Sequence, residues 1–508
     1  MSPVASQQVA TLDLASLERF QSELIEAGFE PVPGDLREWV GPIAEPLREF
    51  TAVTTMKVSF RDGWPFQYPR LFVDGIDELH TNAHGELCLW HAGAASDQWL
   101  TFAGYVARIE EWARRTRDSD FRPEDFALDA HLAFGHVRLG AIATVELDKL
   151  QLDLTPRGIR KVSGRWNNTN GVLAIDPGSD GAIEGRGYLV ASVRTAPRDL
   201  DAVKSLLTLQ QRNNFERRFR GINEGGRPHL FLIAWQRERG LEALVLLAQK
   251  RDEQVVAEAI EVAPRDTKVL KLRAGPDSEL LSGKHIVVFG AGAIGSNVAF
   301  RLAEAGLGTL TVVDDGRLRP GDIVRHAAER WAIGVAKVSA VSVDLKSRTP
   351  WTKVESIAES PWSPARISEL ILGVDCVIDA TGLGAFANML SAICRSERSP
   401  LISAALFRAG SVARVRRQAA ADDVAITGRT EDCGYPQIPY APEPPRYEAG
   451  CSAPINNASP VAVAATAALT AAVVIDFLAG RAEYGDEVIE VFHALDEAPF
   501  DRVGTLRS

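Results

Sequence analysis

Cysteine is scarce in this chain and its number is odd. There are five among 508 residues, at Cys88, Cys376, Cys394, Cys433 and Cys451. Small secreted domains carry dense, even sets of cysteines, so this count indicates no disulfide framework and favours a reduced, cytoplasmic location. The first residues, MSPVASQQVATLDL, also lack the basic stretch followed by an apolar run that a secretory signal would have.

The chain also has no excess of basic residues. The chain has 56 Lys and Arg against 67 Asp and Glu, for a formal net charge of -11. An acidic balance argues against nonspecific binding to nucleic acid, so no nucleic-acid partner is predicted. One stretch, 461–478, is nearly free of charge and approaches the roughly 20 residues of a membrane span. Because Ala and Thr dominate it, we expect a buried core or interface helix and no membrane partner.

A chain of this length is predicted to form two to four domains. Residues 1–140 show apolar positions at helical spacing over 12–27, strand-like runs at 52–60 and 71–74, and a second amphipathic helix over 98–117. This order predicts a small α+β domain.

Residues 141–275 contain turn-forming clusters of Gly, Asn and Asp between possible strands. They carry no catalytic constellation, and a mixed connector domain is predicted. From residue 276 to 508, strands alternate with helices, which predicts an α/β domain with a mainly parallel, doubly wound, Rossmann-like sheet. Residues 418–459 interrupt this pattern with prolines and no clear period, and a long loop of this kind is typically functional or disordered.

A glycine turn begins the C-terminal domain, in the sequence KHIVVFGAGAIGS from residue 284. Gly290, Gly292 and Gly295 would let the backbone approach phosphate groups at a helix N-terminus. Asp314 follows at the end of the next strand, where an acid can accept hydrogen bonds from ribose hydroxyls. These features alone fit a nicotinamide or flavin enzyme equally well.

Charged residues after this turn shift the prediction towards phosphate transfer. Asp322, Arg325 and Lys337 follow Asp314. Two cations near a phosphate-binding turn can neutralise charge on a transferring phosphoryl group or on leaving pyrophosphate. The alternative is that Arg325 and Lys337 are ordinary surface charges on a loop and a helix.

Together these residues resemble the ThiF-type adenylation domain of ubiquitin-activating enzymes and of their bacterial relatives in thiamine and molybdopterin biosynthesis. The resemblance implies that Asp314 holds the ribose of ATP and that Arg325 and Lys337 contact its phosphates, while Asp322 stands where the family usually has Asn. It also implies that Asp379, in VIDATG at 377–382, helps to hold Mg²⁺.

A second motif lies in HTNAHGELCLW, residues 80–90. The thiol of Cys88 could carry an acyl group as a thioester, and the amide of Asn82 could donate a hydrogen bond to the oxyanion when an amine attacks. The alternative is that Cys88 has no chemical role and is simply a small apolar side chain buried in the core. The segment resembles the active site of ubiquitin-conjugating enzymes, with matches at His80, Asn82, Gly85, Cys88, Leu89 and Trp99, and with Thr81 in place of the usual Pro.

Cys451 precedes the apolar helix, where the adenylating family carries its acceptor cysteine. A thiol near a helix N-terminus also tends to have a lowered pKa. Cys433 is the rival acceptor, and Pro436 replaces the second cysteine of a zinc half-site that related enzymes have there, so a four-ligand zinc site is not predicted.

These resemblances support one hypothesis, a fused activating and conjugating enzyme similar to those of CBASS antiphage operons. It would use ATP and Mg²⁺ to adenylate the C-terminal carboxylate of a protein, form a thioester on Cys451, pass the acyl group to Cys88 and ligate it to an amine, such as that of Lys. The resemblance implies a cGAS-like nucleotidyltransferase or a ubiquitin-like protein as the activated partner, and a homodimer. Three alternatives stay open: activation of a sulfur-carrier protein, a nicotinamide- or flavin-dependent oxidoreductase, and a non-enzymatic scaffold.

Overall fold

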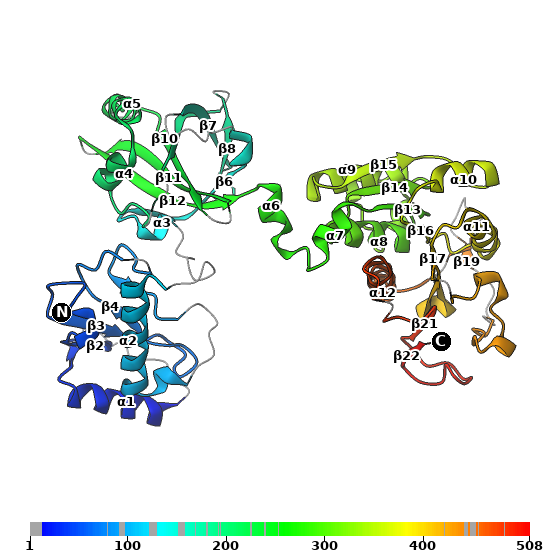
Figure 1. Ribbon diagram of the computed structural model, residues 1–508, viewed down its shortest axis with the longest axis horizontal. Coiled ribbons are helices and arrows are strands. Elements are labelled where there is room, and N and C mark those ends of the chain that lie inside the picture. Colours follow the sequence, from blue (N-terminus) through cyan, green and yellow to red (C-terminus); the bar gives the residue numbers. More distant parts are fainter. Residues whose placement is uncertain are drawn as a thin grey trace. The chain divides into compact units, whose positions relative to one another are not determined.

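The chain folds into two compact units, Met1–Asp266 and Thr267–Ser508. The structure is a computed structural model (Figure 1). It describes residues 13–507 except for 79, 91–96, 121–129, 151–157, 168, 179–180, 192, 194, 224–225, 238–239, 252, 421, 441–445, 448–453, 456 and 482.

The first unit begins with an antiparallel meander between two helices, in the order that the sequence predicts. Helix α1 covers Leu14–Glu26 and α2 covers Phe102–Asp118. The sheet has the order β1-β2-β3-β4-β5, with bounds Glu30–Val32, Asp35–Pro42, Thr55–Ser59, Arg70–Phe72 and Glu86–Leu87. Asp13 caps α1 by accepting a hydrogen bond from the Ser16 amide at 3.0 Å, and Thr101 caps α2 in the same way through Gly104.

Aromatic side chains fill the core of this layer. Phe20 of α1 is fully buried and its ring lies edge-on to those of Phe60, Trp64 and Tyr105 at centroid distances of 5.4, 5.5 and 5.9 Å. Such edge-to-face pairs add roughly 0.5–1.5 kcal/mol each beyond the burial of their area. The core therefore joins the helices and the sheet into one rigid support for the segment after β4.

The remainder of the first unit is a closed seven-stranded barrel, where the sequence predicts a mixed connector. Its strand order is β10-β11-β12-β6-β8-β7-β9, and closure leaves no unpaired strand edge. In chain order β6 to β12 cover Val137–Val145, Ile159–Asn167, Val172–Pro177, Ile183–Val190, His229–Arg237, Gly240–Arg251 and Gln254–Pro264. The first barrel strand begins at Val137, and the unit ends just after β12.

Three helices accompany the barrel: α3 (Ala130–Ala133), α4 (Leu200–Leu206) and α5 (Leu209–Arg220). Phe215 of α5 is fully buried against Phe231 of β10, with ring centroids 4.5 Å apart. The buried amide of Gln211 donates to the carbonyl of Leu189 at 2.9 Å, which ties the start of α5 to β9.

The second unit contains an eight-stranded sheet of order β15-β14-β13-β16-β17-β18-β21-β22. Neighbouring strands are parallel from β15 to β17 and antiparallel from β17 to β22, so the prediction of a doubly wound α/β sheet is confirmed and an antiparallel edge is added to it. The bounds of β13 to β18, β21 and β22 are His285–Phe289, Thr309–Val313, Lys353–Ile357, Cys376–Asp379, Leu401–Phe407, Val412–Gln418, Glu487–Val491 and Gly504–Arg507.

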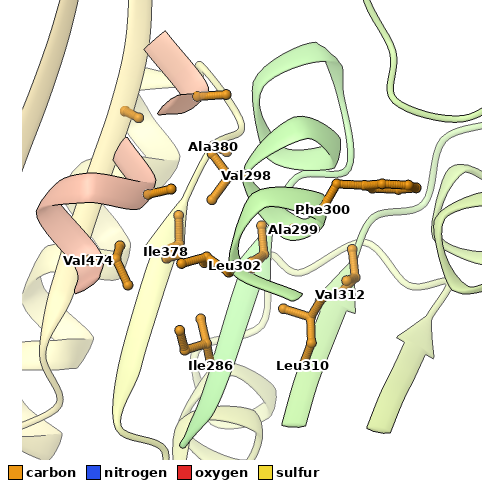
Figure 2. Packing of buried hydrophobic residues seen from close by; sticks show 14 of the residues in the cluster. Ile286, Val298, Ala299, Phe300, Leu302, Leu310, Val312, Ile378, Ala380 and Val474 are labelled. Atoms are coloured by element: carbon orange, nitrogen blue, oxygen red, sulfur yellow. The ribbon is translucent and has the colours of Figure 1, made fainter. Parts of the chain in front are cut away.

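Helices cover both faces of this sheet. α8 (Ala293–Glu304), α9 (Lys337–Arg348) and α12 (Pro460–Leu478) share one hydrophobic cluster with it, while α10 (Pro364–Ile371) and α11 (Gly384–Glu397) share another. Figure 2 shows α8 directing Val298, Ala299 and Leu302 towards the strands, with Val474 of α12 close to Ile378. The near-continuous apolar strands are typical of a parallel sheet that is buried on both faces. Cys376 and Cys394 are buried in this core.

Helix α12 is long and apolar enough to cross a membrane by length and composition, with half of its most apolar window buried in the protein. It packs as a core helix. Val463, Ala467 and Val474 are buried against the sheet and α8, and the buried hydroxyls of Thr466 and Thr470 donate to carbonyls one turn earlier, each at 2.7 Å.

Candidate active site

The turn between β13 and α8 depends on two close approaches of the backbone. Gly290 has φ of +92°, and a Cβ there would come within 2.9 Å of the Ala380 backbone. A Cβ at Gly295 would lie 1.8 Å from the carbonyl oxygen of Gly290. Both positions therefore require glycine so that α8 can start directly above the strand.

Gly292 is different, because a Cβ there would meet nothing within 4 Å. It occupies the N-cap of α8, and within the described chain no side chain caps this helix. The first N–H groups of a twelve-residue helix thus face open space. Such an end attracts anions through its unpaired N–H groups and the helix dipole.

Asp314 and Lys337 lie beside this turn. One carboxylate oxygen of Asp314 accepts from the amide of Ala291 and the other from the amide of Gly316, each at 2.7 Å. Lys337 is the first residue of α9, and its Nζ would be 3.3 Å from a Cβ placed on Gly316. The acid therefore holds the glycine turn against the end of β14, with the ammonium group close by.

A cleft of about 200 Å³ opens at this edge of the sheet. Gly290, Gly292, Asp314 and Lys337 line one part of it, and the side chains of Trp362 and Phe386 contribute apolar surface. Trp362 is 48% exposed and its ring meets that of Phe386 edge-on at 5.5 Å. An exposed indole beside a phosphate-binding turn can stack on a nucleobase.

The sequence reasoning missed this aromatic wall. Trp362 follows β15, and Phe386 lies in the first turn of α11, so each comes after a different strand. The available signal was their position, because side chains that follow the carboxyl ends of parallel strands collect at one edge of the sheet.

Four predicted residues do not line the cleft: Gly295, Asp322, Arg325 and Asp379. Asp322 accepts from the amide of Arg319 at 2.9 Å and so closes a short helical turn. Arg325 donates to the carbonyl of Ala458 at 3.4 Å, and its own carbonyl accepts from the side chain of Asn297 at 2.9 Å. Their predicted contacts with ATP stay predictions.

His326 supports the glycine turn from behind. Its Nδ1 accepts from the amide of Ala328 at 3.0 Å, so Nε2 carries the proton and donates to the carbonyl of Ala291 at 2.8 Å. Burial lowers the pKa of this imidazole, in agreement with a neutral ring. His326 and Asp314 thus hold the two backbone groups of Ala291 from opposite sides.

Asp379, predicted to help to hold a metal ion, is only 2% exposed. One oxygen accepts from the hydroxyl of Thr381 at 2.7 Å and the other from the hydroxyl of Ser403 at 2.8 Å. Burial raises the pKa of this carboxyl group. Thr381 lines the cleft, whereas Asp379 lies behind it.

This arrangement does not fit a direct ligand of Mg²⁺. Magnesium usually bonds to one or two carboxylates together with water and substrate phosphates. Asp379 is buried behind the cleft, and the hydroxyls of Thr381 and Ser403 each donate to one of its oxygens. The geometry instead makes Asp379 a support for Thr381.

Cys88 directly follows β5. Its amide donates to the carbonyl of His80 at 2.7 Å, and its Sγ donates to the carbonyl of Trp90 at 3.6 Å. The thiol is partly buried. Burial and then the charge of Glu86 raise its pKa, while Arg108 opposes them. The thiol is therefore protonated at neutral pH in this conformation.

Asn82 braces the turn that precedes Cys88. Its Oδ1 accepts from the amides of His84 and Glu86, each at 2.9 Å, and its Nδ2 donates to the Glu86 carboxylate at 3.0 Å. Gly85, with φ of +76°, lies so close to β4 that a Cβ would be 2.6 Å from the carbonyl oxygen of Val73. The predicted residues thus form one ordered loop, in which the Asn82 amide is engaged with the turn itself.

A residue in the connection between β9 and α4 holds the same loop. Arg198 forms an ion pair with Asp77 and donates to the carbonyls of Thr81 at 3.3 Å and Asn82 at 3.4 Å. Sequence reasoning missed Arg198, because an arginine in a connection more than a hundred residues away carries no local signal.

The predicted acceptor Cys451 lies outside the described residues. The rival Cys433 is exposed, at the end of the short helical turn Glu431–Cys433. The segment around it is fixed by Arg429, which donates to the Asp486 carbonyl at 2.7 Å and to the Glu487 carboxylate at 3.3 Å. These contacts tie Arg429 and the turn that follows it to the start of β21.

A parallel sheet with a glycine turn, an acid after the next strand and a cleft at its carboxyl edge defines a nucleotide-binding α/β domain. The ThiF family model matches residues 267–506. The second unit of this chain is therefore a ThiF-type domain, as the sequence motifs predict.

Two relatives show the extent of the sequence similarity. The ATP-dependent ubiquitin transferase-like protein Cap2 of Pseudomonas aeruginosa is 34% identical over 128 residues, which cover 24% of this chain and 22% of Cap2. The SAMP-activating enzyme E1 of Haloferax volcanii is 29% identical over 137 residues, 26% of this chain and 50% of that protein. The first curated relatives are matched over about a quarter of their own length.

Among solved structures, E. coli MccB with ATP aligns with a TM-score of 0.36 and 16% identity, over 47% of this chain and 66% of MccB.

Proposed function

We propose that the second unit uses ATP to adenylate the C-terminal carboxylate of a protein or peptide. The observation that carries this proposal is one cleft that joins the open N-terminus of α8, Asp314, Lys337 and the Trp362 ring. The helix end and the ammonium group suit phosphates, and the indole suits adenine. The match to the ThiF family and the names of the relatives support this nucleotide over a nicotinamide.

In the proposed reaction the substrate carboxylate attacks the α-phosphorus of ATP, an acyl-adenylate forms and pyrophosphate leaves. Lys337 and the N–H groups at the start of α8 stabilise the charge that develops on the phosphates. Asp314 holds the glycine turn, and each of its oxygens accepts one backbone hydrogen bond and keeps a second acceptor site for a ribose hydroxyl. Arg325 is the further cation that the family motif assigns to the phosphates. Magnesium accompanies ATP in this proposal, and we assign no step to it because Asp379 is buried behind the cleft.

The proposal extends to a relay between two thiols. The Cys451 thiolate displaces AMP to give a thioester, the Cys88 thiol takes over the acyl group, and an amine such as that of Lys attacks to give an amide. The hydrogen-bonded loop that contains Asn82 and Cys88 supports this extension. The similarity to the ATP-dependent ubiquitin transferase-like protein Cap2 also supports it. The activated partner would be a cGAS-like nucleotidyltransferase, with the enzyme acting as a cytoplasmic homodimer.

The protonated, hydrogen-bonded thiol of Cys88 favours a second candidate function. In this function the enzyme adenylates a ubiquitin-like or sulfur-carrier protein, and Cys88 takes no part. Burial raises the pKa of this thiol, and its Sγ donates to a backbone carbonyl. One matched relative is named molybdopterin-synthase adenylyltransferase.

The nucleotide site is tested by ligand-induced thermal shift. We expect ATP with magnesium to stabilise the full chain and NAD or NADPH not to do so. Trp362→Ala should weaken ATP binding by roughly 1–3 kcal/mol, the usual contribution of base stacking. Trp331→Ala is the matched control, since Trp331 is also about half exposed and does not line the cleft. Stabilisation by NAD alone, or equal losses in both variants, would refute the proposal.

The relay is tested with ATP and a candidate partner protein, by following adducts on gels with and without a reducing agent. Cys451→Ala should abolish the adduct that dithiothreitol cleaves. Cys88→Ala should keep that adduct and block the amide product. A normal amide yield from Cys88→Ala would leave adenylation standing and favour the second candidate.

A further inference from the structure

A basic cleft lies in the first unit, and none of its lining residues belongs to the nucleotide cleft or to the Cys88 loop. It has a volume of about 400 Å³ and is lined by the end of α5, by residues 221–223 and 226–227, and by the first residues of β9 and β10. Arg217, Arg218, Arg227 and His229 line it, and Glu184 is the one carboxylate among its described lining residues. Because β9 and β10 are parallel neighbours, with Gly185 opposite Leu230, both begin at this end of the barrel.

The cations of this cleft have no carboxylate partner within the described residues. Arg218 Nε and His229 Nε2 are buried atoms without a hydrogen bond. Arg186, which is 8% exposed, influences both groups electrostatically and donates to the carbonyl of Gly185 at 2.7 Å. By contrast, Arg220 on the same helix turn as Arg217 pairs with Glu216 at 3.2 Å. His229 is an uncharged imidazole at neutral pH, so its Nε2 is a donor in only one tautomer, whereas Arg218 Nε is always a donor. Buried donors are nearly always paired in folded proteins, so an unpaired arginine N–H beside a cleft indicates a missing acceptor.

The electrostatics agree with this interpretation. Burial, followed by the charges of Arg218 and Arg186, lowers the pKa of His229 to about 4. Burial and the charge of Arg218 also lower the pKa of Arg186. Partly buried cations that repel one another cost free energy, and an anion in the cleft would offset that cost.

A structural explanation covers only part of the cluster. Arginines in the last turn of a helix are stabilised by the negative end of its dipole, which accounts for Arg217 and Arg218. It does not account for Arg227 and His229, which follow the helix and line the cleft. Nor does it account for Arg186 on β9, whose charge interacts with those of Arg218 and His229. The concentration of these basic groups needs another reason.

We propose that this cleft binds a small phosphate-bearing metabolite, of the size of a nucleoside diphosphate or a sugar phosphate. Guanidinium groups bind phosphate oxygens through paired hydrogen bonds, and several of them match more than one phosphate charge. The volume lies within the range of roughly 300–1,000 Å³ that small-molecule sites occupy. Glu184 and Asn223, which also line the cleft, offer hydrogen bonds to hydroxyl groups of such a ligand. The site does not depend on the proposed adenylation.

The test is calorimetric titration of the full chain with inorganic pyrophosphate, a probe that carries the shared phosphate chemistry. Arg217→Gln and Arg227→Gln each remove one exposed cation and should each weaken binding about tenfold, as the loss of one charged hydrogen-bonded pair would. Arg220→Gln is the matched control and should leave binding unchanged. Lys337→Ala should also leave it unchanged, which separates this cleft from the nucleotide site. A thermal melt of each variant checks that it is folded.

Four outcomes would overturn the proposal. The first is no binding of pyrophosphate at millimolar concentration. The second is an equal loss in Arg220→Gln, which would mean attraction to the helix charge as a whole. The third is binding that Lys337→Ala removes. If Arg217→Gln fails to fold, Arg227→Gln decides the matter alone. Tight binding of a single-stranded oligonucleotide without binding of pyrophosphate would also reject a metabolite site and point to a macromolecule.

Discussion

At the scale of single residues, two glycines of the ThiF-type unit are expected to have different roles. Gly295 lets α8 pack against the turn, and Gly292 leaves room for the phosphates of ATP. Gly295→Ala places a methyl group 1.8 Å from the carbonyl oxygen of Gly290, so α8 must shift, and we expect a loss of about 1–3 kcal/mol or more in the free energy of unfolding. Gly292→Ala meets no neighbour and should unfold normally, yet bind ATP at least about tenfold more weakly, because its methyl group would occupy the approach of the phosphates. Chemical denaturation and ATP titration of both variants check this pair.

Two results would contradict these expectations. Normal ATP binding by a well-folded Gly292→Ala variant would show that phosphates do not approach the start of α8. An unchanged denaturation midpoint for Gly295→Ala would contradict the close approach of α8 to the turn.

The Cys88 thiol gives a prediction about pH. Its pKa is raised above the ordinary value of 9.0 because of burial, so the reactive thiolate is scarce at neutral pH and increases about tenfold per pH unit until the pH reaches the raised pKa. Alkylation of Cys88 by iodoacetamide should therefore be slow at about pH 7 and still be rising at about pH 9. Mass spectrometry of the Cys88 peptide measures the rate, with the exposed Cys433 as an internal comparison. A rate that levels off near neutrality would contradict the raised pKa.

At the scale of elements, the connection between β9 and α4 restrains the Cys88 loop through Arg198. Removal of this guanidinium group in Arg198→Ala deletes its hydrogen bonds to the carbonyls of Thr81 and Asn82. We expect about 1–3 kcal/mol less protection of the amides in residues 80–88, as for hydrogen bonds that involve a charged group. Hydrogen exchange monitored by mass spectrometry reports on this segment directly.

Asp77→Ala is the matched control for Arg198. It removes only the ion pair with an exposed carboxylate, and such pairs contribute about 0–1 kcal/mol. Equal loss of protection in both variants would mean that the ion pair, and not the contact with the loop backbone, holds the segment. No change in either variant would exclude the restraint.

At the scale of the whole molecule, the chain divides after Asp266 into units with separate hydrophobic cores. A unit with its own core can fold alone. Residues 267–508 expressed separately should therefore unfold cooperatively and bind ATP within about twofold of the affinity of the full chain. Circular dichroism and titration with ATP check both points. An unfolded fragment, or one that no longer binds ATP, would show that the first unit completes the nucleotide site.

Much of the architecture could be predicted from local patterns. The alternation of strands and helices after residue 284, the apolar period of α1 and α2 and the burial of α12 all follow from side-chain spacing and composition, and the structure bears them out. The closed barrel was not predicted, because the pairing of β9 with β10 and of β6 with β12 joins distant segments whose partners no local pattern names.

The sequence by itself determined the glycine turn, Asp314, Lys337 and the ThiF-type domain, since each depends on residues within about one strand and one helix of one another. Only the tertiary structure decided that Trp362 faces the cleft, that hydroxyl groups occupy the oxygens of Asp379, and that arginines from β9, α5 and the loop after it converge. The physical reason is the same in all three cases. Burial and charge at a site depend on the distance between side chains in space, and those distances arise when separate strands and helices pack together.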